Sequence, residues 1–154
     1  MYYELYQSIK RLVADSMGLS VNPDSGEVSA IDPDGLQDIQ WFNAQYEGVI
    51  HAAPVLFVEF SPLVINRQTK QTRTSEIGIR LHVVSGVMGE SDGDIPDRDV
   101  YRHEELAKRV LEALEDKSLT FLGEETRPLR LSGWTHHHKY NGWMVTLIDL
   151  KTKG

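Results

Sequence analysis

The stretch that most constrains the fold is a β-hairpin pattern near the end of the chain. Residues 129–150, LRLSGWTHHHKYNGWMVTLIDL, contain two apolar runs separated by a polar segment. We expect strands over 128–135 and 143–151, joined across residues 136–142. The turn pattern is Asn141-Gly142, two residues that tolerate the positive φ of tight turns. We interpret this stretch as the closing hairpin of a sheet.

A second, longer hairpin is predicted over residues 54–85. Its first strand, 54–60, is a short apolar and aromatic run bounded by prolines, which is typical of a largely buried strand. Its second strand, 73–85, alternates, with Ile77, Ile79, Leu81 and Val83 on one face and Glu76, Arg80 and His82 on the other. The pattern indicates one buried face.

The polar tip of this long hairpin carries three cations, Arg67, Lys70 and Arg73. They are either a solvated tip or a surface that contacts a neighbouring subunit or nucleic acid. We therefore keep them as candidate partner-interface residues.

Two amphipathic helices are predicted, because apolar residues recur at three- and four-residue steps. The first covers residues 2–16 and the second residues 100–116, with Asp97 or Asp99 as the N-cap of the second. The apolar stripes consist of Tyr2, Leu5, Tyr6, Ile9, Leu12 and Val13 in the first helix, and of Val100, His103, Leu106, Ala107, Val110, Leu111 and Leu114 in the second.

Two segments rich in Gly, Pro, Asn and Asp, 19–35 and 86–99, are predicted to be loops. Residues 39–50 fit either a helix or a strand, since periodicity alone does not separate the two. The fold class that follows is α+β: a mainly antiparallel sheet of four to five strands flanked by two helices, in the order α-β-β-β-α-β-β.

Length and composition exclude several classes of protein. A chain of 154 residues corresponds to a single domain spanning residues 1–154. Its formal net charge of −7 argues against a dedicated nucleic-acid binder, which needs a basic surface to displace counterions from phosphate. It has no cysteine, and no apolar run approaches the ~20 residues of a membrane-spanning helix. We expect a location in the cytoplasm or in a virion.

The three consecutive histidines, 136–138, suggest a metal site. Successive strand residues point to opposite faces, so only His136 and His138 could converge on one ion. A metal needs further ligands, and the nearby sequence supplies neither a cysteine nor a suitable carboxylate. We predict no native metal, no cofactor and no catalytic residues, with His136 and His138 kept as weak metal-ligand candidates.

The order helix, strand, long hairpin, helix and final hairpin resembles the tail terminator (minor tail protein U-like) family of long-tailed bacteriophages and prophages. Three passages carry the resemblance: the aromatic segment Trp41-Phe42-Asn43-Ala44 before the proline-led strand 53–58, the long strand 77–84 followed by a loop and helix, and Ser132-Gly133-Trp134 leading through a polar turn to Gly142-Trp143. The resemblance favours a strand at 39–46.

The resemblance implies an α/β subunit that assembles into a ring, usually a hexamer, which caps the tail tube and contacts head-completion proteins. It implies no catalytic residues and a location in the virion, or in the host bacterial cytoplasm during assembly. An exposed sheet edge must be covered, and a closed ring of heterologous contacts covers it. On this hypothesis Trp134 and Trp143 are either core residues or interface anchors.

Two alternatives remain. The first, within the same class, is a head-tail connector or neck protein. The second is a small metal-dependent or ligand-binding enzyme that uses His136 and His138.

Overall fold

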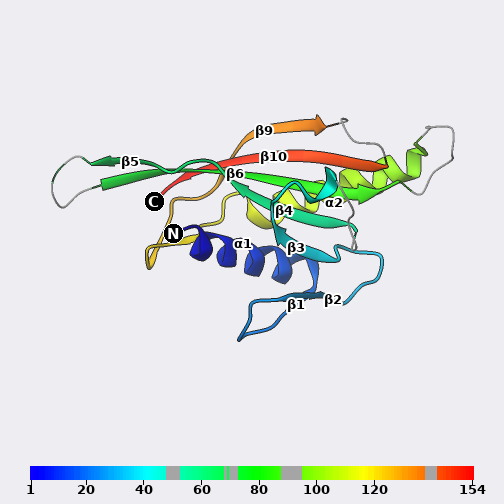
Figure 1. Cartoon of the computed structure of the whole chain (residues 1–154), viewed down its shortest axis with the longest axis horizontal. Helices are drawn as coiled ribbons and strands as arrows, with labels where there is room; N and C mark the ends of the chain where they lie inside the picture. The colour runs from blue at the N-terminus through cyan, green and yellow to red at the C-terminus, as the bar shows by residue number, and fades with distance from the viewer. Residues whose placement is uncertain (48–52, 68, 70–72, 88–94, 138–141) are drawn as a thin grey trace.

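The computed structural model describes residues 1–47, 53–67, 69, 73–87, 95–137 and 142–154. Its main sheet has six strands, and both helices pack on one face of it (Figure 1). The helices are α1 (Tyr2–Met17) and α2 (Asp97–Leu114), and η1 (Gln45–Glu47) is a short 3-10 helix. The strands are β1 (Leu19–Val21), β2 (Val28–Ala30), β3 (Asp38–Trp41), β4 (Val55–Phe60), β5 (Val64–Arg67), β6 (Arg73–Gly86), β7 (Thr120–Phe121), β8 (Glu124–Glu125), β9 (Arg130–His137) and β10 (Trp143–Lys153).

The sheet is organised around β6, which is 14 residues long. The strand order is β3-β4-β6-β10-β9, and β5 also pairs with β6 beyond the end of β4. All of these pairings are antiparallel except that of β3 with β4, which is parallel. The predicted α+β class, with a mainly antiparallel sheet and two helices, is confirmed.

The helix-side face of the sheet carries the main core. Leu5, Ile9 and Val13 of α1 and Val110 and Leu114 of α2 are fully buried there. They pack against alternate residues of the central strands: Leu56, Val58, Ile77, Ile79, Leu81, Val83, Ile148 and Leu150. The apolar face predicted for residues 77–83 and the buried stripe of α1 are therefore confirmed. The prediction of a single buried face holds only for the first half of that strand, because His82 on the opposite face is buried as well.

The opposite face, which we call the outer face, has a smaller apolar cluster at one end only. It consists of Tyr46, Val55, Phe57, Val84, Val145 and Leu147, with Phe42 and Trp143 packed against it. The segment that follows β3 supplies Phe42 and Tyr46, so it covers this end of the outer face. The predicted burial of strand 54–60 is confirmed for its first half, because residues 55–58 are fully buried on both faces.

Several elements differ from the sequence prediction. The predicted loop 19–35 contains the β1–β2 hairpin, and short strands β5, β7 and β8 bring the strand count above four to five. Residues 38–41 form a strand, as the resemblance favoured, and 45–47 then form a 3-10 helix, so neither single prediction for 39–50 was complete. The turn pattern at Asn141-Gly142 lies partly outside the described residues; Gly142 has a φ of 84°.

The start of α2 also differs. The N-cap is Pro96, with no side-chain cap bond, so the prediction of Asp97 or Asp99 as N-cap was wrong. Proline's fixed φ begins the helix earlier than expected, and both aspartates fall in the first turn, where the helix dipole favours negative charge. Val100 is 44% exposed, because it lies about 100° around the helix from buried Asp99.

His103 joins α2 to the sheet through two buried hydrogen bonds. Its Nδ1 lies 2.8 Å from Ser85 Oγ and its Nε2 lies 2.8 Å from Thr146 Oγ1. Burial, with a smaller contribution from His136, lowers the pKa of His103 from 6.5 to about 4. His103 is therefore hydrogen-bonded through both ring nitrogens and is neutral at pH 7.

This burial predicts a pH-dependent stability. Between pH 6.5 and about pH 4, His103 is protonated in the unfolded chain but neutral in the folded chain. The free energy of unfolding therefore decreases as the pH is lowered across that window, and it levels off below about pH 4. Between pH 7 and pH 4.5, the free energy of unfolding of His103→Gln should decrease by about 2–3 kcal/mol less than that of the wild type. Urea unfolding at the two pH values makes the measurement.

The matched control is Ser85→Ala, which removes one of the same hydrogen bonds and keeps the imidazole. It should be less stable than wild type at pH 7 but keep the wild-type pH slope. Equal slopes in His103→Gln and wild type would contradict the assignment.

Candidate functional site

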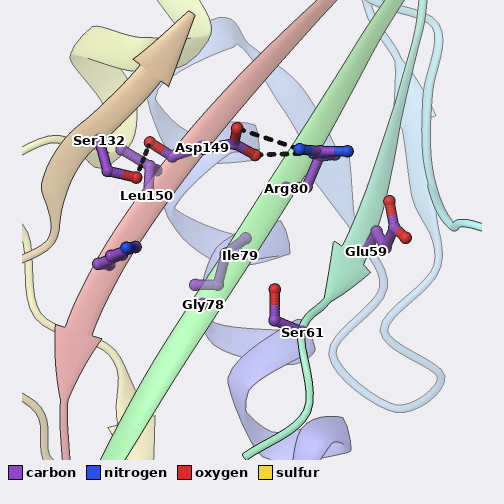
Figure 2. Close-up of a pocket in the computed structure, with 9 residues that line it drawn as sticks. Glu59, Ser61, Gly78, Ile79, Arg80, Ser132, Asp149 and Leu150 are labelled. Carbon is purple, nitrogen blue, oxygen red and sulfur yellow. Dashed lines mark hydrogen bonds and ion pairs between the residues drawn. The ribbon is translucent and has the colours of Figure 1, made fainter.

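The outer face away from the apolar cluster is crossed by a row of charged residues. Glu59 of β4 pairs in register with Arg80 of β6, which pairs with Asp149 of β10. Arg80 Nε lies 2.8 Å from Asp149 Oδ1 and Nη2 lies 3.3 Å from Oδ2, a two-pronged ion pair that raises the pKa of Arg80 (Figure 2). The ion pair holds the charged ends of Arg80 and Asp149 in place on the outer face of the sheet.

Next to this row the outer face is hollowed where side chains are small. Gly78 leaves a space in which an added Cβ would lie 3.0 Å from Ser61, and the cavity there measures about 400 Å³. Figure 2 shows Ser61, Gly78, Arg80 and Asp149 around this hollow, and Ser132 beside it donates to the main-chain oxygen of Asp149 at 3.1 Å. Because Ser61 and Gly78 are small, their side chains leave this space unfilled.

A polar network lies at the Glu59 end of the charged row. His82 is buried, with its Nδ1 2.9 Å from the Tyr46 hydroxyl and its Nε2 2.7 Å from Glu59 Oε1. The ring of Phe42 stacks on it at a centroid distance of 3.9 Å. Burial lowers the pKa of His82 although Glu59 opposes the shift. A neutral imidazole that accepts from Tyr46 and donates to Glu59 satisfies this geometry and holds residues 42–46 on the sheet.

The edge strand β9 is exposed along most of its length. None of its eight residues is buried, and Leu131 and Trp134 are 41% and 40% exposed. Within the described ranges, β10 is the one strand that pairs with β9, so β9 forms an edge of the sheet. Exposed strand edges of this kind form contacts with other chains unless they are protected.

A two-stranded arm, formed by β5 and the start of β6, extends beyond the end of β4 (Figure 1). All four residues of β5 are exposed, including the apolar Val64 and Ile65. Arg67, the last residue of β5, lies in register with Arg73, so the structure brings these two predicted interface residues together. Lys70, the third, lies outside the described residues.

At the root of the arm, a groove of about 670 Å³ lies between the arm and the ends of β9 and β10. Four cations line it: Arg127, Arg130, Lys151 and Lys153. No local sequence pattern predicts this grouping, because the residues come from separate segments. The one available signal was the pair Lys151 and Lys153 two residues apart on a strand, which places both on one face.

The two predicted interface tryptophans are not brought together. Trp134 is paired with Ile148, a core residue of the helix-side face, whereas Trp143 packs against the outer-face cluster, over Gly86. Leu131, which belongs to the first apolar run of the predicted hairpin, is exposed. Trp134 is thus a surface residue at the edge, and Trp143 is largely a packing residue.

The predicted metal-ligand candidates do not form a described site. His136 is an exposed residue of β9, and His138 lies outside the described residues. Among the residues that the structure places, no three or more His, Asp or Glu side chains are grouped to hold a metal ion. In the same part of the chain, no helix has the length and apolar character needed to span a membrane.

Comparison with known proteins gives a match in fold. No protein-family model matches the chain. No curated protein matches its sequence. A solved structure described as the virion of a native gene transfer agent particle contains a chain of similar fold, with a TM-score of 0.57, 9% sequence identity, and coverage of 99% of this chain and 95% of that one. At this identity the likeness shows a shared fold.

The different placement of the two tryptophans gives a prediction about stability. Trp143→Ala should destabilise the protein by about 3 kcal/mol, because it empties a packed position in the outer-face cluster. Trp134→Ala should change the free energy of unfolding by about 1 kcal/mol or less, since much of this side chain already contacts solvent. Chemical denaturation of the two variants and wild type makes the comparison, and equal losses would contradict it.

Proposed function

We propose that this chain is a structural protein of a phage-like particle, and within that class a tail terminator that assembles as a homo-oligomeric ring. The observation that carries the proposal is the fold likeness to a gene transfer agent virion chain, which spans nearly the whole length of both chains. The likeness covers 99% of this chain and 95% of that chain.

The surfaces of the molecule support an assembly role. One face of the sheet is covered by helices, whereas much of the other face, the edge strand β9 and the arm remain exposed. Exposed apolar residues on both edge elements, Trp134 on β9 and Val64 on β5, are the type that become buried between subunits. The charged row in the hollow of the outer face supports binding to a protein better than binding to a small apolar ligand.

Within this proposal the partners are further copies of the chain, in a ring that is usually hexameric in the family it resembles, together with the tail tube and head-completion proteins. The protein would reside in the virion and, during assembly, in the host bacterial cytoplasm. No catalytic role, cofactor or specific nucleic-acid site forms part of the proposal. A neck or connector protein is the nearest alternative, because it would use the same open surfaces at the same junction.

Separating free tails from free heads distinguishes these two roles. In particles from the strain that carries this gene, assembly blocked at the head stage leaves tails, and assembly blocked at the tail stage leaves heads. A terminator should be found with the headless tails, whereas a neck protein should be found with the tailless heads. Immunoblotting of both fractions makes the measurement, and absence from both would contradict the structural role altogether.

A further inference from the structure

Acidic and basic residues are concentrated in two different parts of the chain. Residues 12–66 contain eight acidic residues and no lysine or arginine, whereas residues 126–154 contain five basic residues and one acid. The first segment runs from α1 through β1, β2 and the edge strand β3 to β4 and β5; the second includes β9 and β10. Five of the eight acidic residues lie between β1 and the end of β3, namely Asp24, Glu27, Asp32, Asp34 and Asp38, and β3 and β9 are the two ends of the strand order.

The basic surface is the groove at the root of the arm. Arg127, Arg130, Lys151 and Lys153 are all exposed, and Glu76 is the acidic residue of the lining. Arg130 lies 3.5 Å from exposed Asp116, so it is partly neutralised. The apolar part of the lining includes Pro62, Val64 and Pro128, and Val64 is 49% exposed. The groove thus combines a cationic rim with an apolar floor, which fits an acidic segment that carries an apolar side chain.

The chain itself carries such a segment, in the turn between β2 and β3. Ile31 is 71% exposed and is followed by Asp32, Pro33 and Asp34, all exposed. The turn is held by Asp32 Oδ1, which accepts from the main-chain N–H of Asp34 at 2.9 Å, and by Gln37 Nε2, which donates to the carbonyl oxygens of Asp32, Pro33 and Gly35. An ordered turn loses little conformational freedom when it binds.

We propose that the 31–34 turn of one copy docks into the basic groove of a second copy. Ile31 would contact the apolar floor beside Val64, and the carboxylates of Asp32 and Asp34 would face the cationic rim. The connection from β2 to β3 and the C-terminal end of β10 lie toward opposite ends of the molecule's long axis (Figure 1), so the contact joins two molecules.

The contact is heterologous, because it joins different surfaces of the two copies, and each copy keeps one groove or one turn available for a further neighbour. Repetition of such a contact closes a ring when the rotation between neighbours permits it. This inference rests on the proposed function, because it supplies the contact through which the proposed ring would form.

A charge exchange tests the contact in solution. Lys151→Glu reverses one charge of the groove rim, and Asp34→Lys reverses one charge of the turn; both positions are exposed. Sedimentation velocity over a concentration series should show self-association of the wild type that weakens in about 1 M salt, where the Debye length is about 3 Å. Each variant should associate at least about tenfold more weakly, and an equimolar mixture of the two should associate more strongly than either alone.

Two further variants make the comparison specific. Ile31→Ser should weaken association without changing the fold, since the side chain is mostly exposed. Lys108→Glu, the same charge reversal on the exposed surface of α2, should associate as the wild type does. Circular dichroism and thermal unfolding of each variant check that the fold is retained.

The proposal is overturned if the wild type stays monomeric throughout, if Lys151→Glu and Asp34→Lys associate like the wild type, or if their mixture gains nothing over each alone. These outcomes are separable from the proposed function. A chain found with headless tails whose self-association ignores the charge reversals would refute this contact and leave the tail role standing. If self-association responds to the charge exchange but the chain is absent from both particle fractions, the contact is supported and the proposed tail role is refuted.

Discussion

The structure depends on the antiparallel ladder between β6 and β10. Residues 76–86 pair without interruption with residues 143–153, and the remaining strands of the sheet are added outward from these two. Because side chains alternate along a strand, one register places Ile77, Ile79 and Leu81 against the helices and directs Gly78 and Arg80 to the outer face. A slip of one residue would bury the arginine and expose the isoleucines, so the helix-side core and the outer surface are fixed together.

Local patterns were sufficient to predict the elements whose environment is uniform. The apolar face of 77–83 and the helical stripe of 2–16 were visible in the sequence, because each packs against the same core along its whole length. The burial of His82 on the outer face was not visible, because it depends on Phe42 and Tyr46 from a separate segment. The parallel pairing of β3 with β4 was not visible, since no local pattern reports the direction in which two strands meet. Val100 was misplaced because hydrophobicity alone does not tell whether a partner reaches the first turn of a helix.

The residues of the arm and the groove could be predicted only in part, because a local pattern reports only residues that are close in sequence. Arg67 and Arg73 are close in sequence, and a hairpin necessarily brings them together. The cations of the groove are brought together by the meeting of β9, β10 and the segment before β9, which no local pattern describes. Trp134 and Trp143 looked equivalent in the sequence, yet the strand geometry sends one to the helix-side edge and the other to the outer-face cluster.

One face of the sheet is therefore covered by helices, whereas the other is covered only in part. The helices and the His103 hydrogen bonds complete the first, whereas the arm, the basic groove and the exposed strand β9 leave the second available to other chains. The most direct test is a cryo-electron microscopy map of the head-tail junction of particles from the strain that carries this gene. The account predicts a ring of copies of this fold at the head-proximal end of the tail, each with its 31–34 turn against a neighbour's groove. A junction whose density accommodates no copy of this fold would contradict it.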